Sequence, residues 1–453
     1  MKFLFVTPYL HQDIGVCEFD LSHAWRNPPF NVVLLASWLN QHGHESRIAD
    51  LQRELIRAHG DTAACLDSLR KHIRAIAPDV IGFSFFSTHM PEIADISART
   101  REICASLGMA PIFIAGGIHP TVEPESTLRE CDVDYVCIGE GELPLLALAQ
   151  GASPEGIPGI GLPSRPVVQK TPIVQDLDSL PFPDYTLCDW KLYSTPTYLR
   201  VKAHKTQTLD LMLGRGCAFS CNFCAYKALS PVRFHSADYF LDMVDATGRT
   251  CRGVTDFYIL DSTIGTNRNL LVELCEKSIA RGFPKKYRFL GNMRADQVNE
   301  ELLSLMQRAG FIYLFYGFES GSQNDLDRIN KKTSISDNYN AAMLHNKLNF
   351  LYNASMLINY PGQTVSDLRE TEKFLLSVKP RSVGINMYSP LPGCRDYDAL
   401  KEHFILPNGK YDWRAIGMAR FTSVFAAMTK DDLLYWKDRL ETIASTLGEC
   451  DAG

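Results

Sequence analysis

Short apolar runs alternate with helical patterns in two blocks, and this alternation constrains the fold more than any other feature. The first block covers residues 1–150 and holds five such runs. They lie at Phe3–Val6, Ser46–Ala49, Val80–Phe86, Ile112–Ala115 and Tyr135–Ile138. Strands that alternate with helices favour βαβ units and a parallel sheet. We therefore expect an α/β, doubly wound, Rossmann-like domain here, with its ligand at the carboxyl ends of the strands.

The second block follows a proline-rich stretch. Residues 151–200 hold eight of the 24 prolines, so we interpret 151–205 as a linker. The alternation resumes with six apolar runs at Leu209–Leu213, Phe257–Leu260, Tyr287–Leu290, Tyr313–Phe318, Ala354–Ile358 and Val383–Tyr388. Six strands with helices between them predict a partial, TIM-like (β/α)₆ barrel over 206–394. Residues 395–453 have helical patterns and predict a small helical C-terminal region.

Three cysteines lie within eight residues, directly after the first predicted barrel strand. Cys217, Cys221 and Cys224 have the spacing C-x₃-C-x₂-C. Iron–sulfur clusters are held by thiolates, normally four, so three thiolates leave one iron of a four-iron cluster open to an outside ligand. Zinc with His235 as a fourth ligand is the alternative interpretation. The loop follows a barrel strand at its carboxyl end, where the active sites of barrels gather.

The flanks of these cysteines resemble the cluster loop of radical S-adenosylmethionine (SAM) enzymes. Gly214 and Gly216 precede the first cysteine, and Phe223 supplies the aromatic residue of the family pattern C-x₃-C-x-aromatic-C. The resemblance implies that the amino and carboxylate groups of SAM chelate the open iron. The segment Tyr316–Ser322, which reads Tyr-Gly-Phe-Glu-Ser-Gly-Ser, resembles the motif of the same family that contacts the ribose and methionine of SAM.

The implied SAM contacts lie at the ends of three predicted strands. Glu319 and Ser320 belong to the motif just described. Arg294 follows Asn292 by two residues and is the candidate for the methionine carboxylate, because a guanidinium binds carboxylates bidentately. A surface salt bridge is the alternative role for Arg294. Asp261 stands where many relatives carry Gly-Gly-Glu to hold the methionine amine, and we expect it to substitute for that motif.

The first block resembles the cobalamin-binding domain of cobalamin-dependent radical SAM enzymes. The cobalamin contacts that this implies lie at strand ends, at Thr7, Ser84, Gly116, Gly117, His119, Gly139 and Glu140. None of the 12 histidines follows an aspartate by two residues, so the Asp-x-His-x-x-Gly pattern of a lower histidine ligand is absent. We expect no histidine on the lower face of cobalt, with His119 lining its loop or simply hydrogen-bonded.

Composition narrows the classes of partner. A net charge of −6 argues against nucleic acid, and no apolar run approaches the roughly 18 residues of a membrane span. Pro8 interrupts the apolar residues at the start of the chain, which leaves too short an apolar run for a signal peptide. Thirteen irregularly spaced cysteines do not form a secreted disulfide framework. We expect a cytoplasmic protein, in a reducing compartment that would protect a cluster.

The resemblance implies a cobalamin-dependent radical SAM methyltransferase of the class B type. It would act on an unactivated carbon, or on phosphorus, of a small molecule. Its cofactors would be a [4Fe-4S] cluster, SAM and cobalamin, and its electron donor a flavodoxin or ferredoxin. One SAM would donate the methyl group, and a second would give a 5′-deoxyadenosyl radical. The motifs identify no catalytic residue of the protein itself.

Other functions stay open at this point. A cobalamin-binding radical enzyme could rearrange, cyclise or oxidise its substrate without methyl transfer. The first domain could have lost cobalamin, or the chain could be a non-catalytic sensor. A methylthiotransferase is disfavoured, because the cysteines of the first block do not gather on predicted strand ends. They are Cys17, Cys65, Cys104, Cys131 and Cys137.

Overall fold

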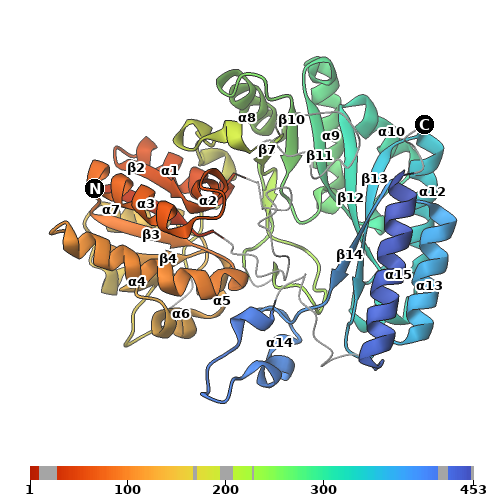
Figure 1. The fold of residues 1–453 in the computed structure, drawn as a ribbon. Helices are drawn as coiled ribbons and strands as arrows, with labels where there is room; N and C mark the ends of the chain where they lie inside the picture. The colour runs from red at the N-terminus through yellow and green to blue at the C-terminus, as the bar shows by residue number, and fades with distance from the viewer. Residues whose placement is uncertain (10–27, 167–170, 194–207, 227–228, 417–426, 450–453) are drawn as a thin grey trace. The chain divides into compact units, whose positions relative to one another are not determined.

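The computed structural model describes residues 1–9, 28–166, 171–193, 208–226, 229–416 and 427–449. Cys17, named above, lies outside these ranges. The chain divides into two compact units (Figure 1). The first unit comprises 1–198, 205–209 and 243–254, and the second comprises 199–204, 210–242 and 255–453. Each unit is built on its own six-stranded sheet.

The sheet of the first unit has the strand order β2-β1-β3-β4-β5-β6. Its strands are β1 (Lys2–Thr7), β2 (Glu45–Asp50), β3 (Val80–Ser84), β4 (Ile112–Gly116), β5 (Tyr135–Cys137) and β6 (Ile160–Gly161). The pairs from β2 to β5 are parallel, and β6 joins β5 antiparallel. The order 2-1-3-4-5 is that of a flavodoxin-like doubly wound fold, whose ligands sit at the carboxyl edge near the β1–β3 switch point. The five predicted strands and the predicted fold class are confirmed.

Helices cross over between these strands. They are α1 (Phe30–Gln41), α2 (Leu51–Arg57), α3 (Thr62–Ile76), α4 (Met90–Ser106), α5 (Ile118–Val122), α6 (Pro124–Glu130) and α7 (Glu142–Ala149). The sequence of α3 shows why they form. Cys65, Leu69, Ile73 and Ile76 are its buried residues, at helical spacing, and the Asp61 carboxylate caps the helix by accepting the Ala63 and Ala64 N–H groups.

The stretch predicted as a linker is packed onto the first unit in its described part. Within it, β6 extends the sheet, and Leu177, Leu180 and Tyr185 are at most 2% exposed. The Asp184 backbone N–H donates to the Ser37 hydroxyl of α1 at 2.8 Å. The prolines therefore indicate an irregular backbone here. The segment still packs onto the unit, because apolar side chains between the prolines are buried.

The sheet of the second unit has the strand order β14-β13-β12-β11-β10-β7. Its strands are β7 (Thr208–Leu211), β10 (Asp256–Ile259), β11 (Arg288–Met293), β12 (Phe311–Glu319), β13 (Leu351–Ile358) and β14 (Ser382–Met387). Neighbours from β10 to β14 pair in parallel. These are the six predicted strands, in the sequential order of a partial barrel. A two-stranded ribbon, β8 (Gly214–Arg215) with β9 (Arg233–Phe234), is an addition that the sequence did not predict.

Helices follow these strands and continue to the C-terminus (Figure 1). They are α8 (Ala237–Thr250), α9 (Arg268–Ala280), α10 (Glu300–Arg308), α11 (Gln323–Arg328), α12 (Ile335–Leu348), α13 (Val365–Val378), α14 (Tyr397–Leu400) and α15 (Lys430–Glu449). Helix α15 packs against β14 and α13, and Leu433 and Leu440 are fully buried there, as expected of a packing helix. No helix among the described residues is long and apolar enough to cross a bilayer.

Candidate functional site

The three cysteines lie on the loop between β8 and β9, which we call the cluster loop (residues 217–224). Its entry requires glycine at Gly216, which has φ of +85°. A Cβ there would stand 2.6 Å from the Ser230 carbonyl oxygen, so no other residue fits. The Ser262 hydroxyl donates to the Gly216 carbonyl at 3.0 Å. The loop therefore leaves the ribbon in a fixed direction.

The thiols of the cluster loop are half-buried. Burial raises the pKa of Cys221 and Cys224, and the nearby Lys331 ammonium works against this rise in both. Cys217 and Cys221 raise the pKa of Cys224 further, so the three thiols are close enough for their charges to interact.

No three His, Cys, Asp or Glu side chains in the described ranges are placed to hold one ion together. A four-iron cluster binds each thiolate to a separate iron, so three neighbouring thiols on one loop suit such a cluster.

The motif after the fourth barrel strand meets the cluster loop through a buried ion pair. Lys331 Nζ lies 2.9 Å from Glu319 Oε1, and the two side chains are only about a tenth exposed. Gly317 makes room for the pair, since a Cβ at that position would lie 2.3 Å from Glu319 Oε1. Lys331 Nζ also lies 5.8 Å from the centroid of the Phe223 ring, between the last two cysteines. Sequence reasoning gave Lys331 no role, because no local pattern shows which carboxylate a lysine will reach.

Ser320, within the same motif, is buried and stabilises the turn that follows β12. Its hydroxyl donates to the Asp325 carboxylate at 3.0 Å and accepts the Ser322 N–H at 3.0 Å. Gln363, in the turn after β13, donates to the same Asp325 oxygen at 2.7 Å. The predicted contact of Ser320 with SAM stays a prediction. The structure places its hydroxyl in a network that joins the loops after β12 and β13.

Arg294 also lies beside the cluster loop. Its guanidinium is 3.6 Å from the centroid of the Phe219 ring, and it donates to Asp296 at 3.0 and 3.1 Å. It donates as well to the Lys331 carbonyl at 2.9 Å. Arg294 is 6% exposed and Asp296 is 27% exposed, so this salt bridge is part-buried rather than the surface pair considered from sequence.

Asp261 and Asn292 line the carboxyl ends of neighbouring strands. The Asp261 carboxylate accepts the Leu213 N–H at 2.9 Å, and burial raises its pKa to about 7. Asn292 donates to the Asp261 carbonyl at 2.8 Å and accepts the Tyr258 hydroxyl proton at 2.8 Å. Asp261 therefore supports the backbone that leads into the cluster loop, and its contact with the methionine amine stays a prediction.

The predicted cobalamin contacts gather at one edge of the first unit. Thr7, Ser84 and Gly116 end β1, β3 and β4, and Gly139 and Glu140 follow β5. Because these strands are parallel, their carboxyl ends form a common edge, which is where such a fold binds ligands. The Thr7 hydroxyl donates to Asp50 at 3.2 Å. This arrangement fits a large ligand lying across the strand ends.

Gly117 shows how tightly this edge is built. Its φ is +97°, and a Cβ would lie 2.9 Å from the Phe85 nitrogen and 3.1 Å from the Ser84 hydroxyl. Gly139 also has positive φ, and its N–H donates to the Thr121 hydroxyl at 2.9 Å. The glycines therefore allow the backbone turns that keep side chains away from the strand ends.

His119 is buried behind this edge. Nδ1 lies 2.9 Å from the Ser87 hydroxyl and Nε2 lies 3.3 Å from the Ser126 hydroxyl. Burial lowers the pKa of the ring to about 3. Both nitrogens of His119 are thus hydrogen-bonded within the protein, and the lack of a histidine ligand to cobalt stays a prediction.

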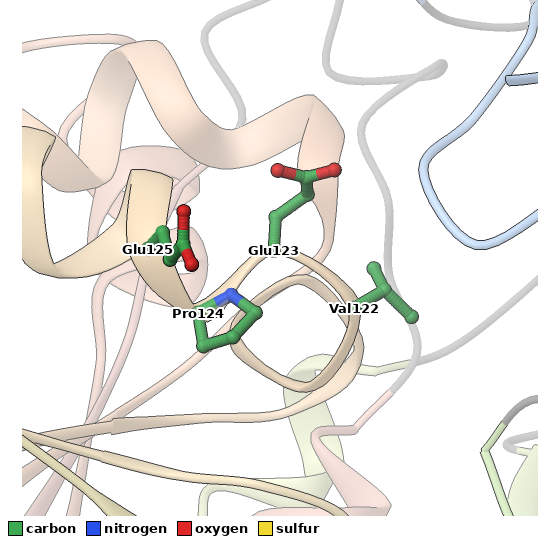
Figure 2. A pocket seen from close by; sticks show the side chains of 4 residues that line it. All are labelled: Val122, Glu123, Pro124 and Glu125. Atoms are coloured by element: carbon green, nitrogen blue, oxygen red, sulfur yellow. The ribbon is translucent and has the colours of Figure 1, made fainter. Parts of the chain in front are cut away.

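A small hollow lies at the junction of α5 and α6 (Figure 2). Its lining consists of Val122, Glu123, Pro124 and Glu125. None of the residues predicted to bind a cofactor is among them. The candidate site therefore rests on the strand ends and the cluster loop rather than on this hollow.

Two protein families match separate parts of the chain. Residues 25–149 match the B12 binding domain, and residues 211–375 match the radical SAM superfamily. The first match covers β2 to β5 and every predicted cobalamin contact except Thr7, which precedes it on β1. The second begins in β7 and includes the cluster loop, Arg294 and the Glu319–Lys331 pair.

Similar proteins span most of the chain at low identity. An anaerobic magnesium-protoporphyrin IX monomethyl ester cyclase of Cereibacter sphaeroides is 25% identical over 91% of this chain and 66% of its own length. An uncharacterised methyltransferase of Pyrococcus horikoshii is 24% identical over 85% of this chain and 81% of its own. The chain thus spans only about two thirds of the cyclase.

Among solved structures, the radical SAM methyltransferase TsrM of Kitasatospora setae, with cobalamin and a [4Fe-4S] cluster bound, has a similar fold. The TM-score is 0.69 at 16% identity, over 89% of this chain and 75% of that one.

Proposed function

We propose that this chain, which belongs to the cobalamin-dependent radical SAM enzymes, is a methyltransferase. Its substrate would be a small molecule that is methylated on an unactivated carbon or on phosphorus. The observation that carries the proposal is the cluster loop beside the buried Glu319–Lys331 pair, in a chain that also has a B12-binding domain. Proteins named as methyltransferases that are similar to this chain over most of its length support the choice of reaction.

The residues present fit the three cofactors of this family. Cys217, Cys221 and Cys224 would hold the [4Fe-4S] cluster, and Glu319 and Arg294 would contact SAM. The strand-end loops of the first unit would hold cobalamin without a histidine ligand. When bound, the cluster and SAM supply a radical that removes hydrogen, and cobalamin supplies the methyl group.

The protein contributes position and charge. With a cluster bound, three thiolates and the Glu319 carboxylate would concentrate negative charge, which Lys331 and Arg294 would offset from buried positions. Such fixed charges need no rearrangement during a reaction. The carboxyl ends of β10, β11 and β12 carry Asp261, Asn292 and Glu319, so a substrate above these ends would lie near both the cluster and SAM.

Two finer proposals follow from the same chemistry. The electron for SAM cleavage would come from a flavodoxin or ferredoxin. A cytoplasmic location would suit this donor and an oxygen-sensitive cluster.

The ratio of products tests the reaction. Methyl transfer of this type consumes two SAM molecules, one as methyl donor and one as radical source. We expect S-adenosylhomocysteine and 5′-deoxyadenosine in about equal amounts, because each molecule gives one of them. The assay would use the anaerobically reconstituted chain with reductant and a panel of candidate substrates, with products measured by mass spectrometry.

A second candidate follows from the cyclase among the relatives. A radical enzyme that cyclises, rearranges or oxidises its substrate would release 5′-deoxyadenosine without S-adenosylhomocysteine. That outcome with a substrate that is converted would refute the methyltransferase proposal. A chain that releases neither product and takes up no cluster would refute both.

A further inference from the structure

Asn222 lies inside the cluster loop, directly after Cys221. The Cys224 N–H donates to the Cys221 carbonyl at 3.2 Å, so Asn222 and Phe223 form the centre of a tight turn between two cysteines. The position of the two thiols depends on how this turn is held. Asn222 carries a peptide N–H, a peptide carbonyl and a side-chain amide, and each of these three groups contacts another part of the second unit.

One partner is the segment that ends α11. The Asn222 N–H donates to the Ile329 carbonyl at 2.9 Å, and its side-chain Nδ2 donates to the Arg328 carbonyl at 3.1 Å. A reciprocal bond runs from Asn330 Nδ2 to the Ser220 carbonyl at 2.8 Å. Asn330 has φ of +54°, which turns the chain sharply back from α11 toward Lys331.

The other partner follows β14, the last barrel strand. The Arg395 N–H donates to the Asn222 carbonyl at 3.0 Å. The next residue, Asp396, accepts the hydroxyl proton of Tyr360, in the turn after β13, at 2.5 Å. The turn between Cys221 and Cys224 is therefore joined through Asn222 to the end of α11 and to the segment after β14.

We infer that Asn222 is the positioning residue of the cluster loop and that, with Asn330, it holds Cys221 and Cys224 at the spacing that a cluster requires. The inference rests on the proposed function, since it presumes that these cysteines hold a cluster. Neither asparagine needs to touch the iron. They act through the backbone of the turn, which carries no regular secondary structure of its own.

The segment Arg328–Lys331 connects the cluster loop to the Glu319–Lys331 pair. It begins at the end of α11 and ends at the lysine that pairs with Glu319. The SAM-binding motif and the cluster loop are therefore attached to the same four residues. A displacement of the turn would be felt at both sites, so loss of Asn222 should affect the cluster and the binding of SAM together.

The test compares Asn222→Ala and Asn330→Gly with a matched control. Glycine at position 330 keeps the positive φ while removing the side-chain amide. The control is Asn346→Ala. Asn346, on α12 of the same unit, donates from Nδ2 to the carbonyl of Val378, the last residue of α13, at 2.7 Å. Each protein is reconstituted anaerobically with iron and sulfide, and the loss of cluster absorbance to an iron chelator is timed.

We expect Asn222→Ala and Asn330→Gly each to lose the cluster about three- to tenfold faster than the unmodified chain, since each removes one side-chain hydrogen bond. Asn346→Ala should match the unmodified chain. The midpoint potential of the cluster should also shift in Asn222→Ala and not in the control. A lowered stability of the fold alone would not produce that shift, because the potential depends on hydrogen bonding and solvent near the cluster.

Equal cluster lifetimes and equal potentials in Asn222→Ala and the unmodified chain would overturn the inference. So would equally fast loss in the Asn346→Ala control, since the effect would then be general loosening. If the unmodified chain itself takes up no cluster, the failure belongs to the proposed function instead. Melting temperatures of all variants, measured before reconstitution, separate a folding defect from a local one.

Discussion

Replacing Lys331 with methionine is expected to destabilise the second unit by about 3–5 kcal/mol, because it leaves the Glu319 carboxylate buried without its cation. The ammonium and the carboxylate are 2.9 Å apart and about a tenth exposed. At an effective dielectric constant of about 20, their attraction at that distance is about 6 kcal/mol. Removing both charges from water offsets most of this gain, so the intact pair adds little net stability, whereas an isolated buried charge is costly.

Urea unfolding of four proteins would measure these terms: the unmodified chain, Lys331→Met, Glu319→Gln and the double variant. The double variant should be more stable than Lys331→Met alone, because it has no buried charge left. The matched control is Lys347→Met. Lys347 pairs with Glu300 at 2.7 Å, but these side chains are 63% and 50% exposed. Its loss should cost no more than about 1 kcal/mol.

The reasoning would be refuted if Lys331→Met and Lys347→Met had the same small effect on the urea midpoint. That result would mean that water reaches Glu319 and that the pair is not a buried one. A double variant as unstable as Lys331→Met alone would also contradict it, because the loss would then come from packing of the lysine stem rather than from charge.

Three further predictions concern the cofactors and pH. Replacing Cys217, Cys221 and Cys224 together with alanine should abolish the cluster, and unchanged iron and sulfide per chain would contradict the assignment. Burial raises the pKa of Asp261 to about 7, so the folded state holds a proton there that the unfolded state releases near pH 4. The free energy of unfolding should therefore fall as pH rises from about 4 to about 7, by at most about 1.4 kcal/mol per pH unit. Asp261→Asn should flatten that slope in urea titrations. Paramagnetic resonance of the cobalt(II) form should show no nitrogen coupling, and coupling lost in His119→Ala would show that His119 is a ligand.

The strands of both units could be predicted from sequence because short apolar runs alternate regularly with helical patterns. Each predicted run overlaps an observed strand, with ends that differ by a few residues. The misses are β6, β8 and β9, which have only two residues each. Such short strands have no periodicity to detect, and they form because the surrounding chain brings two backbones together. The packing of residues 171–193 was not predicted either, because their prolines indicated a linker and their apolar residues show no regular period.

The site was predictable in its residue types but less so in its contacts. The cysteines and the Glu319 motif were identified from their spacing, because residues that are close together in one loop of the sequence also lie close together in the structure. The contacts of Lys331 and Asn222 were not predicted, because their partners lie twelve and more than a hundred residues away. Long-range hydrogen bonds of this kind depend on how strands align, and no local pattern records that alignment.

Arg294 shows where a prediction from residue type meets a competing structural role. Direct contact with the methionine carboxylate predicts that Arg294→Ala lowers SAM affinity about ten- to a hundredfold, the cost of a charge-assisted hydrogen bond. Yet the guanidinium also stacks on Phe219 of the cluster loop and donates to the Lys331 carbonyl. Phe219→Leu separates the two roles, because it removes the stacking and keeps the cation. We expect this variant to bind SAM within about threefold of the unmodified chain. Equal losses of affinity in both variants would assign Arg294 to holding the loop, since only a structural role would be shared by the ring and the guanidinium.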